Sequence, residues 1–297
     1  MNIVSDIRAF TPEVFNNPVV RKHGVVYAET RRDPSAPLEE LSGSMSVQEY
    51  SGDIPLVLSQ KNYERTGTLL SFDEWTKRVE AQVRFYDDIL KQGLGLYAIG
   101  YPNPVHGTDL IRLDDAIDKV NIDTPFVDRP QADAAVLTKE GTASVIAPAD
   151  CVVANSIDVR TGTLLQTHAG YAGIGKNIVS RVFGEVEDVF DPKQSVSYIS
   201  PHAQEGYVIN QQNNVLVERF EADPNLQPFL VYKENGDVEL SLGEAFKAQL
   251  IEAGIPEANI EISPDNNLTD STLYSQSRFL TQGINGRNGM LFGKRIQ

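Results

Sequence analysis

The sequence has few of the residues on which several classes of protein depend. It contains one cysteine, Cys151, so no disulfide can form within the chain and the thiol is free for other chemistry. No stretch approaches the ~18 uncharged apolar residues that are needed to span a bilayer. Residues Met1 to Phe15 lack the basic start and the continuous apolar run of a signal peptide. We therefore expect a soluble protein of a reducing, cytoplasmic compartment, with no membrane partner.

Basic residues are also scarce. The 26 Lys and Arg residues stand against 41 Asp and Glu residues, which gives a formal net charge of -15. That charge would repel a phosphate backbone, and no run of basic residues offsets it. We therefore expect no polymeric nucleic acid as a partner, although a local pair of arginines can still bind one small phosphate.

Length and composition set bounds on the fold. A chain of 297 residues with 41% hydrophobic content can bury a large core. No repeat of fixed period and no low-complexity linker divides the chain, and residues 33–44 and 265–271 have the composition of surface loops. We expect a single domain over residues 1–297.

Two segments, residues 71–90 and 241–253, have the pattern of amphipathic helices. Each begins with a capping box, Ser71 with Glu74 and Ser241 with Glu244, and each is followed by a glycine. Residues 174–183 also have helical spacing. Six runs are typical of strands: 96–99, 134–137, 143–146, 151–157, 164–167 and 195–199. The pattern predicts an α/β protein of the α+β type, with a mixed β-sheet layered with helices.

Two of the four histidines stand in glycine-containing turns beside predicted strands. His106 precedes a glycine, His168 is followed by Ala-Gly, and Cys151 begins another predicted strand. Catalytic zinc often has three dispersed ligands and an open fourth position, and a His-Cys-His set fits that pattern. A lone cysteine is also a common core residue, and histidines are common in turns. Spacing alone leaves both interpretations open.

Short motifs follow one another along the chain. They stand at residues 22–24 (Lys-His-Gly), 104–107 (Pro-Val-His-Gly), 132–136 (Ala-Asp-Ala-Ala-Val), 149–151 (Ala-Asp-Cys), 168–173 (His-Ala-Gly-Tyr-Ala-Gly), 275–278 (Ser-Gln-Ser-Arg) and 286–287 (Gly-Arg). In order and spacing, nearly end to end, this set resembles the laccase-domain family, also called the YfiH-like or multicopper polyphenol oxidoreductase family. Members of that family are regarded as zinc-dependent purine nucleoside phosphorylases.

The resemblance implies a zinc ion at strand-end loops, held by His106, Cys151 and His168, which would also be the catalytic residues. It implies phosphorolysis of adenosine, inosine, guanosine or methylthioadenosine, in which phosphate attacks the anomeric carbon of the ribose. The same site would support adenosine deaminase activity, with zinc activating water for attack on the purine C6. A purine nucleoside and phosphate are the implied partners, and the oligomeric state is left open.

The chain departs from the family pattern beside the predicted site. Ala172 stands where the family has arginine, Pro104 stands where it has glutamine, and Gly206-Tyr207-Val208 stands where it has Cys-Tyr-Glu. Lys176 could replace the lost cation, and His202 could bind substrate or transfer a proton. Arg278 and Arg287 follow family motifs, so they could bind an anion, or they could tie the C-terminal segment to the sheet through carboxylates. Glu205 is a further candidate for proton transfer, and a structural role is expected for His23.

Two other functional classes fit the same residues. Cys151 could be a metal-independent nucleophile for amide or ester hydrolysis, activated by His106 or His168 with Asp150 orienting the base. The chain could also be a catalytically degenerate protein that retains zinc or nucleoside binding. Copper redox chemistry is excluded, because one cysteine and four histidines are too few for the multi-histidine clusters of a multicopper oxidase.

Overall fold

The structure, a computed structural model, describes residues 6–9, 12–31, 94–102, 104–117, 131–204, 208–209, 214–275, 277–278 and 288–296. The helix predicted over residues 71–90 and the loop predicted over 33–44 lie outside these residues. The described helices are α1 (Pro18–Arg21), α6 (Leu113–Ile117), α7 (Tyr171–Gly175), α8 (Ile178–Glu185), α9 (Asn214–Ala222) and α10 (Leu242–Glu252). None of these helices is long and apolar enough to cross a membrane.

The strands form three sheets. Their bounds are β1 (Asp6–Ala9), β2 (Val25–Arg31), β3 (Ala98–Gly100), β4 (Leu110–Arg112), β5 (Ala134–Leu137), β6 (Thr142–Ile146), β7 (Val152–Asp158), β8 (Leu164–Ala169), β9 (Ser195–Ile199), β10 (Val208–Ile209), β11 (Leu230–Tyr232), β12 (Val238–Leu240), β13 (Ile260–Ile262) and β14 (Met290–Lys294). The six-stranded sheet has the order β13-β9-β7-β8-β5-β4, the five-stranded sheet β1-β2-β14-β6-β3, and the small sheet β10-β12-β11. Parallel and antiparallel pairs occur in both large sheets, so the predicted mixed β-sheet layered with helices is confirmed.

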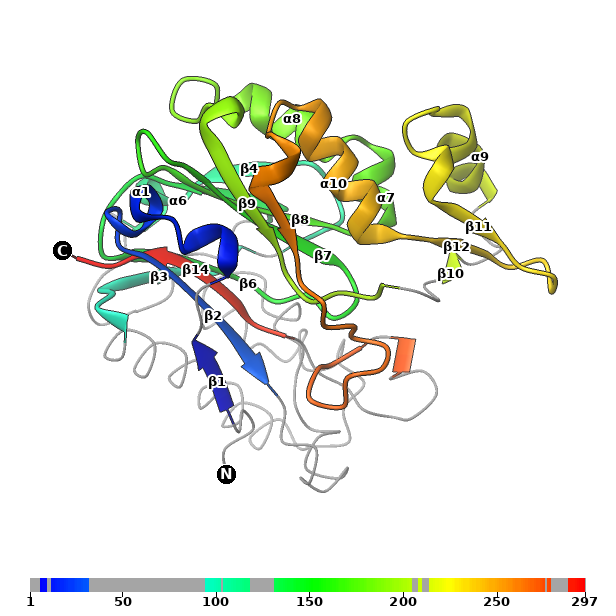
Figure 1. Cartoon of the computed structure of the whole chain (residues 1–297), viewed down its shortest axis with the longest axis horizontal. Helices are drawn as coiled ribbons and strands as arrows, with labels where there is room; N and C mark the ends of the chain where they lie inside the picture. The colour runs from blue at the N-terminus through cyan, green and yellow to red at the C-terminus, as the bar shows by residue number, and fades with distance from the viewer. Residues whose placement is uncertain are drawn as a thin grey trace, which may run out of the picture.

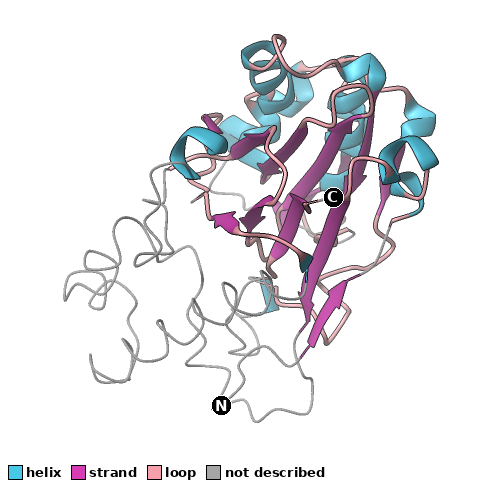
Figure 2. Cartoon of the chain, turned by 90° about the vertical axis from the view of Figure 1, so that its left-hand side faces the viewer, coloured by secondary structure: helices cyan, strands magenta, loops and turns pink. Residues whose placement is uncertain are grey.

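The central strands of the six-stranded sheet, β5, β7, β8 and β9, are buried along their whole length. Because successive side chains of a strand point to opposite faces, both faces of the sheet are covered there. In β5, Ala134 and Val136 belong to the core beneath the helices, whereas Ala135 and Leu137 belong to the core between the two large sheets. Helices α7, α8 and α10 lie on one side of this sheet and the five-stranded sheet lies on the other (Figure 1, with a second view in Figure 2). The described part of the chain is thus layered as helices, sheet and sheet.

The helix predicted over residues 241–253 is confirmed as α10. Its inner side packs into the core through Ala245, Phe246 and Leu250. The predicted capping box is wrong, because Ser241 occupies the N-cap position but its side chain makes no capping hydrogen bond. Gly254 ends the helix with a φ angle of +111°, in the left-handed region that favours glycine.

The single helix predicted over residues 174–183 is wrong, because the chain forms two short helices, α7 and α8, in this region. Asn177 interrupts the helix with a φ angle of +53°, and its side chain accepts a hydrogen bond from the amide of Ser180 at the start of α8. Ile174, Ile178 and Val182 are all buried, and this shared burial explains the helical spacing.

One edge of the six-stranded sheet collects residues that are far apart in the sequence. Strands β7 and β8 are antiparallel with Val153 opposite His168, so Cys151, just before β7, lies beside the end of β8. Strand β5 is antiparallel to β8 and parallel to β4, so the loops before β4 and β5 reach the same edge. We call this edge, formed by the loops before β4, β5 and β7 and by the end of β8, the site edge.

Candidate metal centre

His106, Cys151 and His168 come together at the site edge. Each offers one ligand atom, and these atoms lie within 4.8 Å of one another. The Sγ atom of Cys151 lies 3.7 Å from Nε2 of His106, and the two imidazole rings meet edge to face with centroids 5.3 Å apart. His168 is fully buried, whereas His106 is exposed, so the cluster is reached from the His106 side. The sequence prediction that these three residues meet is confirmed.

A buried carboxylate sets the orientation of the His168 ring. The Nδ1 atom of His168 lies 3.0 Å from Oδ1 of Asp133. Because an ionised carboxylate only accepts hydrogen bonds, Nδ1 carries the proton and Nε2 is the atom left to bind a metal. This Nε2 atom is buried without a hydrogen-bond partner. A buried polar atom without a partner is costly, and a metal ion would satisfy it.

The donor atoms suit zinc, which is bound by thiolate sulfur and imidazole nitrogen. Burial would raise the pKa of the Cys151 thiol, but its interactions with His106 and His168 outweigh burial and lower that pKa to about 6. Burial would lower the pKa of His168, but its interactions with Asp133 and Cys151 raise it to about 9. The surroundings therefore favour a thiolate at Cys151, which is the form that binds metals and acts as a nucleophile.

Gly170, directly after β8, permits this close packing. A Cβ atom at position 170 would lie 2.9 Å from Sγ of Cys151 and 3.2 Å from Cδ2 of His106. The backbone of Gly170 is extended, with φ of -91°, so the requirement for glycine here comes from lack of space. The predicted His-Ala-Gly motif thus supplies both a ligand and the room for two others.

Lys176 and Arg278, two cations predicted to bind substrate or phosphate, differ in their hydrogen-bond partners. Lys176 is exposed, and its Nζ donates a hydrogen bond to the carbonyl oxygen of His106 at 2.9 Å, so a positive charge stands beside the cluster. The guanidinium of Arg278 donates to the carbonyl oxygens of Asp270 and Leu273, which ties this side chain to the preceding loop. Arg287 and Glu205 lie outside the described residues.

His202 is enclosed rather than exposed. Its side chain is buried, Nδ1 lies 2.8 Å from the carbonyl oxygen of Ser200, and its ring packs so tightly on α10 that a Cβ atom at Gly243 would come 2.3 Å from Nε2. Burial lowers the pKa of His202 to about 4, although the hydrogen bond to Ser200 opposes this shift. Contact with substrate would therefore require a movement that exposes this neutral ring.

Asp150 does not have the predicted role of orienting a histidine. Its Oδ2 atom accepts hydrogen bonds from the amide and the hydroxyl of Ser277, at 2.8 and 2.7 Å, so it anchors a C-terminal turn beside Cys151. The carboxylate that is hydrogen-bonded to a histidine of the cluster, His168, is that of Asp133. No role was predicted for Asp133 from the sequence. Asp133 lies directly before a predicted strand, within the Ala-Asp-Ala motif. This position was the sequence feature that could have indicated its role.

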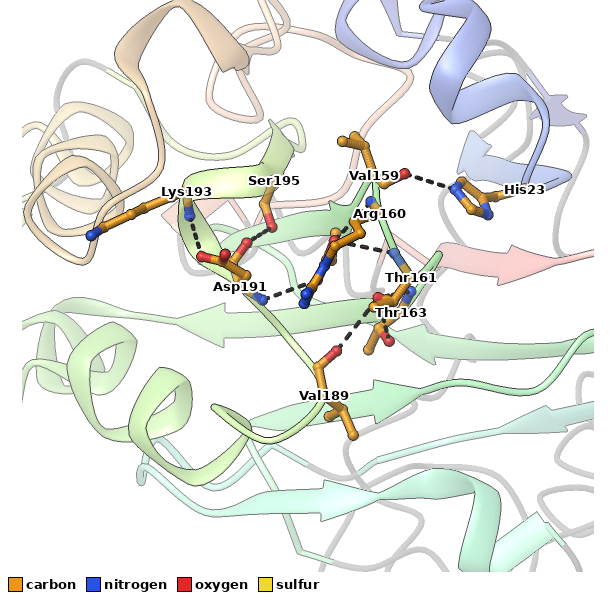
Figure 3. A network of polar contacts seen from close by, with 10 residues as sticks. His23, Val159, Arg160, Thr161, Thr163, Val189, Asp191, Lys193 and Ser195 are labelled. Carbon is orange, nitrogen blue, oxygen red and sulfur yellow. Dashed lines mark hydrogen bonds and ion pairs between the residues drawn. The ribbon is translucent and has the colours of Figure 1, made fainter.

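His23 lies at the far end of the β7–β8 pair from the cluster. Its Nε2 atom lies 2.9 Å from the carbonyl oxygen of Val159, in the turn that joins the two strands (Figure 3). The ring also packs on Gly162, where a Cβ atom would come 2.5 Å from Nδ1. Nearby in the same view, Asp191 caps a turn by accepting from the amide of Lys193. These contacts agree with the structural role expected for His23.

Comparisons with known proteins give both a family and a fold. The family model described as "Multi-copper polyphenol oxidoreductase laccase" matches residues 58–294. A curated relative from an unknown prokaryotic organism, named adenosine deaminase RL5, is 28% identical over 202 residues, which cover 66% of this chain and 74% of the relative.

Solved structures share the fold over almost the whole chain. The hypothetical protein YfiH of Bacillus licheniformis aligns with a TM-score of 0.63 at 16% identity, covering 95% of this chain and 98% of that one. YlmD of Geobacillus stearothermophilus aligns with a TM-score of 0.64 at 20% identity, covering 100% of both chains. At these identities the likeness shows a common fold.

Proposed function

Since this chain belongs to the multi-copper polyphenol oxidoreductase laccase family, we propose that it is a zinc-dependent purine nucleoside phosphorylase. The observation that carries the proposal is the meeting of His106, Cys151 and His168, whose ligand atoms lie within 4.8 Å of one another. Three protein ligands with one open position are typical of catalytic zinc sites rather than structural ones. The name of the curated relative, an adenosine deaminase, supports a purine nucleoside as substrate.

Zinc bound by these three residues would act as a Lewis acid that polarises an oxygen atom placed at its open position. The protein residues themselves shape the centre. Asp133 holds the His168 ring, the His106 side leaves a route from solvent, and Gly170 leaves room for the thiolate of Cys151. Such fixed placement is the main contribution of a protein to metal-assisted catalysis.

Phosphorolysis would join a phosphate oxygen to C1′ of the ribose while the bond from C1′ to the purine nitrogen breaks. The purine leaves with the bonding electron pair and takes up a proton. Lys176, whose ammonium group stands 2.9 Å from the His106 carbonyl oxygen, is the described cation best placed to hold phosphate beside the cluster. Adenosine, inosine, guanosine and methylthioadenosine are the substrates we propose, with adenosine deamination as a second activity of the same site.

The copper chemistry in the family description fits this chain poorly. The whole chain has four histidines. Two of them are in the cluster, while His23 bonds the Val159 carbonyl at the far end of the hairpin and His202 bonds the Ser200 carbonyl. The histidines needed for a group of copper ions are therefore lacking, and we favour a single zinc ion.

A second candidate function is a metal-independent hydrolase, because Cys151, His168 and Asp133 also form a nucleophile, a base and an orienting acid. The lowered pKa of Cys151 favours this arrangement. A chelator separates the two candidates. Removal of zinc would abolish the phosphorylase, whereas it would leave or raise the activity of a cysteine hydrolase.

The experiment that tests the proposal is chromatography of reactions of the purified chain with adenosine and, separately, with inosine, each with and without phosphate. Adenine and ribose 1-phosphate, formed only with phosphate, are expected, and inosine would report the deaminase activity. The same preparation of Cys151→Ala controls for contaminating enzymes. If neither adenosine nor inosine is consumed by a zinc-loaded wild type, the proposed function is wrong.

A further inference from the structure

The side chain of Asp133 accepts four hydrogen bonds, two of which come from ligands of the cluster, His168 and His106. Its side chain is fully buried. Oδ1 accepts from Nδ1 of His168 at 3.0 Å and from the amide of His106 at 2.9 Å. Oδ2 accepts from the amide of Gly107 at 2.8 Å and, at a longer 3.4 Å, from the amide of Val105. One carboxylate therefore connects a ring on β8 with a loop that precedes β4.

We propose that Asp133 is the positioning residue of the metal centre, because it fixes the His168 ring and the His106 loop in their ligand positions at the same time. The inference rests on the proposed function, in which these two histidines bind zinc. Asp133 does not itself reach the ligand position, since both of its oxygen atoms are engaged by donors. Its effect is on metal affinity, through the geometry of two ligands.

The contact with His168 decides which nitrogen is available. A histidine can bind a metal through either ring nitrogen, and the hydrogen bond made by the other nitrogen selects between them. With Nδ1 donating to Asp133, Nε2 of His168 is the nitrogen that faces Cys151 and His106, and a bound zinc ion would take its lone pair in place of a proton. The amide of His168 also donates to the Asp133 carbonyl oxygen at 2.7 Å, so backbone and side chain of the two residues are held together.

The contact with His106 holds a strained backbone. His106 has a φ angle of +57°, a region that residues other than glycine seldom adopt. Such a conformation persists only where the surroundings impose it. Here the amides of three successive residues, 105–107, point at the Asp133 carboxylate, and Lys176 binds the His106 carbonyl oxygen.

The chemistry of the four donors requires a carboxylate at this position. Two carboxylate oxygens offer about four lone pairs, which match the four donors. In Asp133→Asn, one of the two oxygen atoms becomes an NH₂ group, which donates. Two of the four donors would then face this NH₂ group and lose their acceptor. Three of the four donors are backbone amides, which can only donate, so each of them needs an oxygen atom that accepts.

The test compares zinc affinity in Asp133→Asn and in a matched control, Asp114→Asn. Asp114 is also a buried carboxylate, and it accepts hydrogen bonds from the amide and hydroxyl of Thr138 just after β5, whereas Asp133 lies just before β5. Competition with a chromophoric chelator would measure the Kd for zinc in the full-length chain. We expect a 10- to 100-fold weaker Kd in Asp133→Asn and the wild-type Kd in Asp114→Asn.

Equal zinc affinity in Asp133→Asn and wild type would overturn the inference, as would equal weakening in both variants. A wild type that binds no zinc would instead overturn the proposed function. If Asp133→Asn does not fold, long-range ¹H–¹⁵N spectra of zinc-loaded wild type decide, with His168 assigned from His168→Gln. A proton on Nδ1 of His168 supports the inference, and a proton on Nε2 overturns it.

Discussion

Gly170 lies so close to Cys151 that a Cβ atom at position 170 would come within 2.9 Å of the Sγ atom. Replacing Gly170 with alanine should therefore push the thiolate out of its position in the cluster, while the extended backbone accepts alanine without strain. We expect Gly170→Ala to weaken zinc binding by about tenfold or more, which corresponds to at least about 1.4 kcal/mol. Zinc competition titration measures this change.

Gly184 in α8 is the control for this substitution, because a Cβ atom there would meet nothing within 4 Å. Gly184→Ala should bind zinc as the wild type does and should be about 0.5–1 kcal/mol more stable, since alanine favours the helix. Wild-type zinc affinity in Gly170→Ala would show that the centre does not need this close packing.

Lys176 should bind phosphate rather than the nucleoside. We expect Lys176→Met to raise the KM for phosphate by about 10- to 100-fold, because loss of a charge-assisted hydrogen bond to an anion costs about 1.5–3 kcal/mol. The KM for adenosine should stay unchanged. Steady-state kinetics with each substrate varied in turn separates these two constants.

Arg181, an exposed cation in α8, supplies the matched control. Arg181→Met removes the same charge from the protein surface, so it should leave the KM for phosphate as it is. If both variants raise this KM equally, the effect is one of net charge. If Lys176→Met loses zinc, its bond to the His106 carbonyl oxygen holds the loop, and Lys176 is not the phosphate ligand.

His202 should make stability depend on pH. Its pKa is about 4 in the folded chain, below its ordinary value of 6.5, because the ring is buried. The unfolded chain therefore binds more protons between these two values, so this contribution to stability is complete above pH 6.5 and declines as the pH falls toward 4. The slope should be about 1.4 kcal/mol per pH unit within this range.

Urea unfolding of wild type and His202→Gln at several pH values across this range would measure the effect. The unfolding free energy of the wild type minus that of His202→Gln should change with pH by this slope. The absolute stability of the variant does not affect this comparison. Parallel pH profiles would contradict a buried, neutral His202. A raised KM for nucleoside in a variant of wild-type stability would support a substrate-binding role for His202.

The four central strands of the six-stranded sheet, β5, β7, β8 and β9, could be predicted from the sequence because they are short runs of mainly strand-forming residues near turns. The run over 195–199 is β9, and the run over 134–137 is β5. Both faces of these strands are buried; β5 is a continuous apolar run, whereas β9 alternates serine with larger side chains. The break between α7 and α8 could not be seen from apolar spacing, since a left-handed Asn177 leaves the buried positions in phase.

The meeting of His106, Cys151 and His168 could be predicted because their motifs follow the order of the family, although their spacing alone left other roles open. The role of Asp133 could not, because it depends on the pairing of β5 with β4 and β8, which brings one carboxylate against two loops. Asp150 was the more visible candidate beside Cys151, but its carboxylate turns to Ser277. A sequence shows which residues are neighbours along the chain, whereas the sheet decides which of them meet.

Elemental analysis of the purified wild type and of Cys151→Ala is the most direct test of a zinc centre formed by His106, Cys151 and His168. About one zinc ion per chain is expected in the wild type, because the three ligand atoms form one site, and most of this zinc should be lost when the thiolate is removed. Copper in place of zinc, no metal in the wild type, or full zinc content in Cys151→Ala would contradict the proposed centre.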